Sequence, residues 1–186
     1  CVIGATGCWS RAPRTPPSLL LVTIDTLRAD RVGAYGSSQG LTPGFDRLAA
    51  SGWLFERAVS SVPLTLPSHA TILSGLDPPH HGVRNNGTYA FPPNRETLAT
   101  RLKATGYATG AFVAAVVLDR RYGLDRGFDV YDDRIERVAA GRSVLESERP
   151  CLNVVGGARA WIQAQSGPFF AWVHLYEPHA PYTPPA

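Results

Sequence analysis

The sequence predicts an α/β domain built around a mostly parallel sheet, and two observations lead to this prediction. Apolar runs of strand length alternate along the chain with segments of helical periodicity. The apolar runs are continuous, as in parallel strands that are covered on both faces. With 186 residues, of which 44% are hydrophobic, the chain can form one domain with a sizeable core.

Three apolar runs are the main predicted strands. The first two are expected to be buried, and the first ends in an acidic residue, Asp25. A shorter strand is predicted at residues 53–59, WLFERAV. The three main runs are SLLLVTID at residues 18–25, YATGAFVAAVV at 107–117 and PFFAWVHLY at 168–176.

The helices are predicted from their caps and their apolar faces. The clearest begins after Thr42, a candidate N-cap, with Pro43 at its first position, and Gly52 closes it. The polar segment at residues 132–150 is expected to be a surface excursion. The predicted helices are TPGFDRLAASG at 42–52, PSHATILSG at 67–75, ETLATRLKATG at 96–106 and ARAWIQAQ at 158–165.

Composition and charge exclude several classes of function. The net charge is +3, and the charges form no basic run, so neither a nucleic-acid groove nor a polybasic membrane patch is supported. The cysteines Cys1, Cys8 and Cys151 are odd in number and have no CxxC spacing, which indicates neither a disulfide framework nor a zinc site. No run reaches the ~18 apolar residues of a membrane span.

Residues 1–17 are expected to be a tail or the remnant of a signal, and residues 18–186 the domain. The small residues before Cys8 in VIGATGC resemble the end of a lipoprotein signal peptide, which predicts a lipid anchor at Cys8 and a periplasmic or envelope-attached protein. The other interpretation is a frayed tail with an incidental cysteine.

Three polar residues each follow a predicted strand, namely Asp25, Thr65 and His179. Ligands of such sheets gather beyond the carboxyl ends of the strands. Thr65 is expected just outside a helix that has Pro67 in its first turn, where free N–H groups favour an anion. A hydroxyl there can attack an anionic ester if a metal or a base activates it. The same sequence also fits a simple entry turn.

The other candidates each have two interpretations. Asp25 ends a buried strand, so it either binds a divalent cation or caps the turn that follows. His179 either contacts a negatively charged substrate oxygen or packs in its proline-rich loop. His174 is expected in the core or behind the site, and the histidine pair at residues 80–81 is expected to be structural. The pair at residues 85–86, in Asn-Asn-Gly, is expected to form a turn, although its amides could donate to a substrate oxygen.

Together these pieces resemble the sulfatases of the alkaline phosphatase superfamily. Six blocks occur in the sulfatase order and extend over nearly all of residues 18–186. The resemblance implies an alkaline-phosphatase-like α/β/α sandwich, incomplete at its C-terminus, and metal-assisted hydrolysis of sulfate- or phosphate-type esters. The blocks are LLLVTIDTLRADRVGAYG, LTPGFDRLAASGWLFERAVSSVPLTLPSHATILSG, HHGVRNNG, LATRLKATGYATGAFV, DRGFDVYDD and VHLYEPHAPYTPP.

The resemblance also implies roles for four residues. Asp25 matches the first metal-binding aspartate, and Thr65 matches the nucleophile of the pattern Cys/Ser-x-Pro-x-Arg, which also touches the metal. His69 falls at the arginine of that pattern, where it would orient Thr65 or contact the leaving group. His179 matches a histidine that contacts the anionic group of the ester. The implied cofactor is a divalent ion (Ca, Mg, Mn or Zn), with further ligands expected downstream of Ala186.

Three departures from the family pattern bear on the function. Thr26 replaces a second aspartate, and the Lys-x-His motif falls on Ala114 and Val116. Thr65 replaces the cysteine or serine that sulfatases oxidise to formylglycine, so formylglycine is not expected. Threonine nucleophiles occur in relatives such as nucleotide pyrophosphatases, phosphonoacetate hydrolases and lipoteichoic-acid-type synthases.

The sequence therefore predicts a metal-dependent hydrolase of the sulfatase family that acts on a small-molecule, glycan or lipid anionic ester through Thr65. The threonine favours a phosphodiester or phosphonate hydrolase, or a phosphotransferase, as the alternative. The loss of Lys-x-His favours a third possibility, a non-catalytic binding module.

Overall fold

The computed structural model describes residues 15–135, 147–180 and 182 of the chain. Four strands form one sheet in the order β1-β4-β2-β3, and every neighbouring pair is parallel, as predicted. Within the register, Val22 of β1 lies opposite Val173 of β4. The strands are β1 (Leu19–Ile24), β2 (Ala108–Phe112), β3 (Val130–Asp132) and β4 (Phe169–Leu175).

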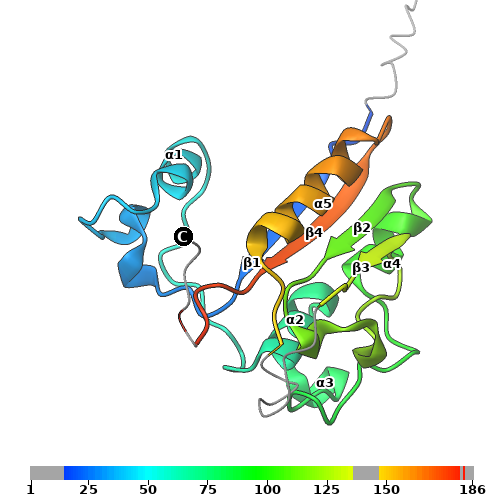
Figure 1. Ribbon diagram of the computed structural model, residues 1–186. Helices are drawn as coiled ribbons and strands as arrows, with labels where there is room; N and C mark the ends of the chain where they lie inside the picture. Colours follow the sequence, from blue (N-terminus) through cyan, green and yellow to red (C-terminus); the bar gives the residue numbers. More distant parts are fainter. Residues whose placement is uncertain (1–14, 136–146, 181, 183–186) are drawn as a thin grey trace, which may run out of the picture.

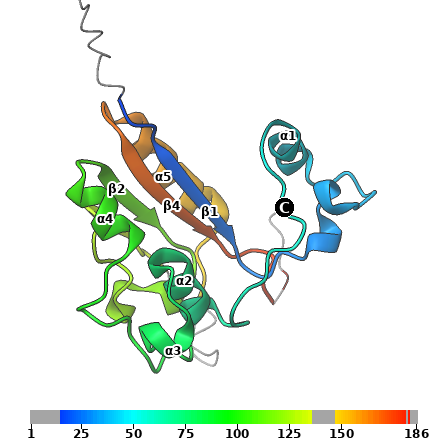
Figure 2. The same ribbon diagram turned by 180° about the vertical axis from the view of Figure 1, so that it is seen from behind.

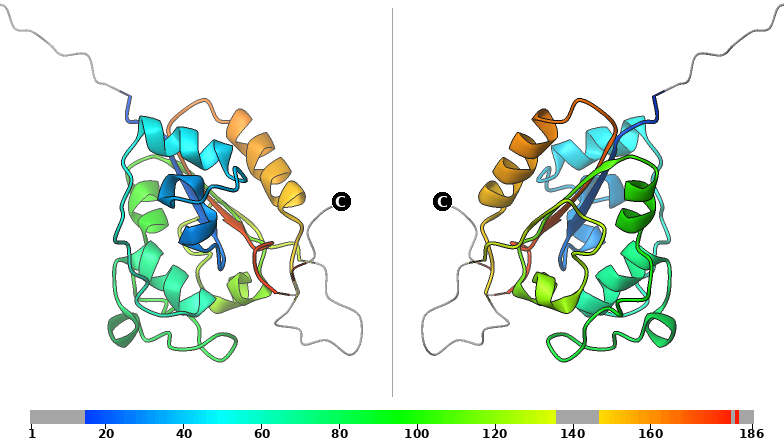
Figure 3. Two further views of the ribbon diagram at one scale, coloured as in Figure 1. Left: turned by 90° about the vertical axis from the view of Figure 1, so that its left-hand side faces the viewer. Right: turned by 90° about the vertical axis from the view of Figure 1, so that its right-hand side faces the viewer.

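Helices cover the sheet on both sides and make an α/β/α sandwich, which confirms the predicted fold class. Figure 3 shows α5 on one face and α2 and α4 on the other. The short helix α3 follows α2 at the end of the sheet where β1 and β4 finish (Figure 1). The helices of these layers are α2 (Thr65–Ser74), α3 (Pro78–His81), α4 (Leu98–Ala104) and α5 (Cys151–Gln163).

The core lies around the two central strands, β2 and β4. Trp172 of β4 is fully buried, and Phe170 stacks on Phe128 with ring centroids 5.7 Å apart. From α2, Leu66 and Leu73 reach the same cluster. The face of α2 that meets the core therefore includes the residue next to Thr65.

The predicted helices form, with shifted boundaries. Thr97 caps α4 through a reciprocal pair of hydrogen bonds with Thr100, and Gly75 ends α2 in a left-handed conformation that suits glycine. The helix predicted from Pro67 begins at Thr65, so Thr65 lies inside the first turn rather than outside it. Since α5 starts at Cys151, it is longer than the predicted segment at 158–165.

Two strand predictions are wrong. The first strand forms, but it is not buried: Leu20 is 58% exposed and Val22 is 45% exposed, because β1 lies at the edge of the sheet while α5 packs on β2 and β4. Residues 53–59 form no strand, and Trp53 is 91% exposed. No described residue pairs with that segment as a strand neighbour.

The segment at 132–150 is not simply a surface excursion. Asp132 and Arg149, near its two ends, are buried, and their charged atoms lie 3.0 Å apart. Residues 136–146 lie outside the described residues, as do Cys1 and Cys8, so the predicted lipid anchor is not tested. Cys151 is a free thiol.

Helix α1 (Pro43–Ser51) lies to one side of the sheet, beyond the end of β1 (Figures 1 and 2). It begins after Thr42 and ends before Gly52 as predicted, although the Thr42 hydroxyl accepts a hydrogen bond from Gly33 N instead of capping the helix. Phe45 and Trp53 line an apolar cavity there of about 390 Å³. Within the described residues, no helix is long and apolar enough to span a membrane.

Candidate active site

A cavity of about 570 Å³ lies where β1 ends and α2 begins. It brings together Asp25, Thr65 and His179, although only Asp25 and His179 follow strands, because the strand predicted before Thr65 does not form. This is the carboxyl end of the parallel sheet, where such folds bind their ligands. Its lining is Thr23, Ile24, Asp25, Thr26, Ser60, Val62, Pro63, Leu64, Thr65, Ser68, His69, Ile72, Asn86 and His179.

The central contact of the cavity joins Thr65 to Asp25. The Thr65 hydroxyl donates a hydrogen bond to Asp25 Oδ2 over 2.9 Å. Asp25 is held in place because its N–H donates to Leu175 O of β4, one residue beyond the end of β1. Thr26 then takes a left-handed conformation with φ 52°, which is uncommon for a β-branched residue and turns the chain away from the sheet.

The electrostatic surroundings keep Asp25 ionised. Burial raises the pKa of its carboxyl group, but the neighbouring His174 and the hydrogen bond from Thr65 lower it more, so the pKa lies below its usual value. His174 Nε2 lies 3.5 Å from Asp25 Oδ2, and no described residue completes a well-formed hydrogen bond to that nitrogen. We therefore treat the His174–Asp25 contact as electrostatic.

Asp25 and Thr65 fit one side of a divalent cation site. A carboxylate and a hydroxyl are hard oxygen donors of the kind that Ca²⁺ and Mg²⁺ select. His174 is not a third ligand in this arrangement, because its Nδ1 accepts from Ala114 N, which leaves the proton on the Nε2 that faces Asp25. Among the described residues, no three His, Cys, Asp or Glu side chains form a metal-binding group.

The start of α2 offers fewer N–H groups than the sequence predicts. Leu66 N donates to Asn86 Oδ1 over 2.9 Å, Ser68 N donates to Leu64 O, and Pro67 has no N–H. Among the described residues, none accepts from Thr65 N. Leu66 and Pro67 therefore offer no free N–H to an anion, and fewer donors remain at this helix start than the sequence predicts.

Sequence reasoning missed the role of the Asn86 side chain at the start of α2. The Asn-Asn-Gly signal correctly predicts a turn at residues 85–88. In the structure Asn86 also lines the cavity and holds the first turn of α2 by its side-chain oxygen. Nothing in the local pattern shows which distant N–H that oxygen would find.

His69 is buried below Thr65. Its Nδ1 lies 2.7 Å from Thr65 O, and its Nε2 lies 3.1 Å from Thr23 Oγ1. Burial, with a smaller contribution from His174, lowers the pKa of His69 to about 3. The ring is therefore neutral at physiological pH, unlike the arginine whose position it takes in the family pattern.

The remaining histidines divide between the cavity and the scaffold. His179 lines the cavity and stacks on Tyr176, with ring centroids 4.3 Å apart. Its Nδ1 donates a hydrogen bond to Ala180 O. His80 pairs with Asp77 on the surface. His81 is buried beside Thr71 and accepts from Val83 N through Nδ1, so this pair is structural as predicted.

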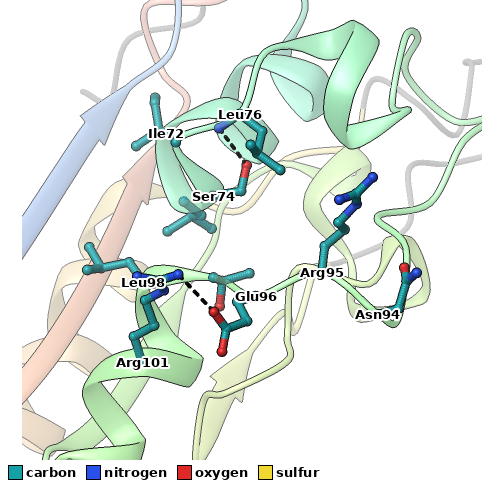
Figure 4. Close-up of a pocket in the computed structure, with 11 residues that line it drawn as sticks. Ile72, Ser74, Leu76, Asn94, Arg95, Glu96, Leu98 and Arg101 are labelled. Atoms are coloured by element: carbon teal, nitrogen blue, oxygen red, sulfur yellow. Dashed lines mark hydrogen bonds and ion pairs between the residues drawn. The ribbon is translucent and has the colours of Figure 1, made fainter.

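A second cavity, of about 580 Å³, lies between the end of α2 and the start of α4 (Figure 4). Ile72 borders both cavities. Two arginines, Arg95 and Arg101, line this second cavity, and Arg101 pairs with Glu96 at 2.9 Å. Its two hydroxyl groups, of Ser74 and Thr97, donate to backbone carbonyls, and Glu96 pairs with Arg101, so the Thr65 cavity remains the candidate active site.

Residues 17–186 match the protein family described as Sulfatase. Since the match covers nearly the whole chain, the chain belongs to the Sulfatase family. The fold, a parallel sheet between helices, is shared by solved structures that include a protein of the alkaline phosphatase superfamily from Vibrio parahaemolyticus.

Individual relatives support this assignment. Mouse steryl-sulfatase is 39% identical over 108 residues, which are 53% of this chain and 17% of that protein. The structure of a 2-O glycosaminoglycan sulfatase is 26% identical with a TM-score of 0.71, over 88% of this chain and 35% of that one. The phosphonate monoester hydrolase of Agrobacterium radiobacter is 23% identical with a TM-score of 0.74, over 91% of this chain and 42% of that one. This similarity supports the assignment of the fold and nothing further. The chain thus spans less than half the length of each.

Proposed function

We propose that the protein hydrolyses a sulfate ester or a related anionic ester, with Thr65 as its nucleophile. The observation that carries this proposal is the 2.9 Å hydrogen bond from the Thr65 hydroxyl to Asp25, which ends a strand in a cavity of a Sulfatase-family chain. A hydroxyl directed at an ionised carboxylate, next to open space for an ester, has the geometry of a nucleophile awaiting activation.

The residues of the cavity have distinct roles in the proposed reaction. Thr65 Oγ1 forms the new bond to sulfur or phosphorus, the ester bond to the leaving group breaks, and the proton released by the Thr65 hydroxyl ends on the departing alcohol. Asp25 accepts the Thr65 hydrogen bond and orients the attacking oxygen. His179 donates from Nδ1 to Ala180 O, so Nε2 would donate to an ester oxygen only when the ring carries a second proton. A divalent cation held partly by Asp25 and Thr65 would lower the hydroxyl pKa and neutralise charge on the transferring group.

The threonine supports phosphorus esters as a second candidate substrate class. Thr65 stands where sulfatases carry a cysteine or serine that becomes formylglycine, and a threonine cannot form that aldehyde. A direct attack by the hydroxyl leaves an ester on Thr65 that must be resolved by water or by another acceptor. This applies to a phosphodiester or phosphonate hydrolase and to a phosphotransferase alike.

Substrates of several sizes suit the family assignment. The relatives named above include a steryl-sulfatase and a 2-O glycosaminoglycan sulfatase. We propose an anionic ester of a lipid, glycan or small molecule as the substrate class of this protein. The N-terminal part of a catalytic domain at residues 18–186 and an envelope-attached location are further proposals.

The test compares an aryl sulfate with an aryl phosphodiester as substrates of the full-length protein. Thr65→Ala should reduce turnover of the preferred ester at least about 1000-fold, since it removes the attacking atom. Thr65→Ser is the matched variant and should keep measurable turnover, because it keeps a hydroxyl. Unchanged turnover in Thr65→Ala would remove Thr65 from the reaction, and an inactive wild-type protein would favour a non-catalytic binding module.

A further inference from the structure

A continuous line of buried hydrogen bonds runs beneath the candidate nucleophile. Trp172 Nε1 lies 3.1 Å from Thr23 Oγ1, and Thr23 Oγ1 lies 3.1 Å from His69 Nε2. His69 Nδ1 then lies 2.7 Å from Thr65 O. The line crosses three elements, from β4 through β1 to the first turn of α2.

The two ends of this line fix the direction of every hydrogen bond in it. The indole N–H of Trp172 can only donate, so Thr23 Oγ1 accepts from it. The Thr65 carbonyl can only accept, so His69 carries its proton on Nδ1. The neutral ring then accepts at Nε2 from the single hydrogen of the Thr23 hydroxyl. One arrangement therefore satisfies all the groups.

The packing around His69 prevents the ring from taking another role. His69 is 6% exposed and lies against Trp172 and His174, with ring centroids 5.6 Å and 4.8 Å away. Both ring nitrogens are occupied, so the ring could reach a leaving group only by breaking two buried hydrogen bonds. Unpaired buried polar groups are costly, which opposes such a rotation.

We propose that Thr23 and His69 are positioning residues that hold the Thr65 backbone so that its hydroxyl faces Asp25. The proposal rests on the proposed function, because it assigns a role in the reaction of Thr65. It replaces the alternative in which His69 contacts the leaving group. It also assigns a part to Thr23, a residue that the family pattern does not mark.

The kinetic test uses Thr23 in the full-length protein. Thr23→Val keeps the shape but removes the hydroxyl, and it should lower kcat about fivefold to tenfold, as the loss of one hydrogen bond would, with KM unchanged. Thr23→Ser keeps the hydroxyl and should stay near the wild-type kcat. An unchanged kcat in Thr23→Val overturns the proposal.

A matched control separates positioning from stability. Thr109 of β2 is a buried threonine of the same sheet, whose hydroxyl bonds Gly127 O at 2.7 Å. Thr109→Val should lower the melting temperature as Thr23→Val does, but leave kcat unchanged. An equal fall of kcat in both variants would mean that Thr23 acts only through stability, and would overturn the proposal.

His69 variants test the bond to the nucleophile itself. The amide nitrogen of asparagine can take the position of Nδ1, so His69→Asn should retain at least about tenfold more turnover than His69→Leu, which has no donor. Equal turnover in the two variants would contradict the role of the Nδ1 donor.

A measurement without substrate keeps the proposal distinct from the proposed function. In ¹⁵N NMR spectra of the full-length protein, His69 should show a protonated Nδ1 and an unprotonated Nε2. A ring protonated on Nε2 would overturn the proposal even in an active enzyme. A wild-type protein without turnover would defeat the proposed function, while the NMR result would still decide whether this hydrogen-bond line exists.

Discussion

The two edges of the sheet are built in opposite ways. At one edge β3 has three residues, and its outer carbonyl at Tyr131 accepts from Arg120 Nη2 over 2.7 Å. At the other edge β1 has six residues, LLLVTI, and no described residue pairs with its outer side. Short strands and charged side chains are common means of closing an edge, and β3 has both. The comparison shows that an apolar strand sequence does not determine whether the strand is covered.

The closed edge depends on buried charge. Asp132 at the end of β3 pairs with Arg149, and both side chains are less than a tenth exposed. Arg134 also contacts Asp132, at 2.7 Å, but its own side chain is 79% exposed. Strand β1 at the open edge, LLLVTI, carries no charged side chain, so variants that disturb charge should affect the two edge strands very differently.

The largest expected effect comes from breaking the buried pair. Asp132→Ala should lower the free energy of unfolding by about 3–5 kcal/mol, because it leaves the Arg149 charge buried without a partner. Arg134→Ala is the control and should change it by less than about 1 kcal/mol, since solvent screens an exposed ion pair. Urea unfolding of the three proteins measures this, and equal effects of the two variants would contradict it.

Acid should weaken the closed edge. The hydrogen bond from Arg134, opposed by burial and aided by Arg149, lowers the pKa of Asp132 from 3.8 to about 2. A carboxyl group with a lowered folded pKa stabilises the protein above its unfolded pKa, and that contribution is lost as the pH falls toward 2. The difference in unfolding free energy between wild type and Asp132→Asn should therefore shrink from pH 5 to pH 2, and a constant difference would exclude this role.

Two valines provide a matched pair across the open side of the sheet. Val173 and Val22 lie opposite each other in the register, but Val173 is 5% exposed and Val22 is 45% exposed. In this 186-residue chain, Val173→Ala should cost about 2 kcal/mol of unfolding free energy and Val22→Ala less than about 1 kcal/mol. Thermal unfolding checks this, and equal costs would show that β1 is covered.

The smallest effect on stability is expected at the exposed edge itself. Leu20→Lys should change the unfolding free energy by no more than about 0.5 kcal/mol, as surface substitutions usually do. It should nevertheless reduce self-association, because a lysine on an open strand disfavours pairing with another chain. Light scattering at matched concentrations measures this, and unchanged association would show that β1 is not the contact.

The sequence predicts the parts of the structure that depend on local pattern. Apolar runs locate β1, β2 and β4, and the caps at Thr42 and Gly75 mark helix ends. The parallel topology follows from their alternation and places Asp25 and His179 beyond the carboxyl ends of β1 and β4, whereas no strand precedes Thr65, which meets Asp25 as the first residue of α2.

What the sequence leaves open depends on partners far along the chain. The pairing of Asp132 with Arg149 and the exposure of β1 depend on which elements pack together, and the hydrophobic periodicity of the local sequence does not determine them. The bond from Leu66 N to Asn86 joins residues twenty positions apart, and the Thr23–His69 contact joins positions even further apart. Such contacts become visible only once the fold sets the distances.

The proline in the first turn of α2 bears on how the product of the proposed reaction would leave. Because Pro67 has no N–H and Asn86 occupies Leu66 N, two positions of the helix start offer no backbone donor to a bound oxyanion. Free inorganic sulfate or phosphate would find no cradle of backbone amides of the kind that retains phosphates at other helix starts. In the proposed reaction, retention of the inorganic ion would then depend on His179 and the divalent cation rather than on backbone amides.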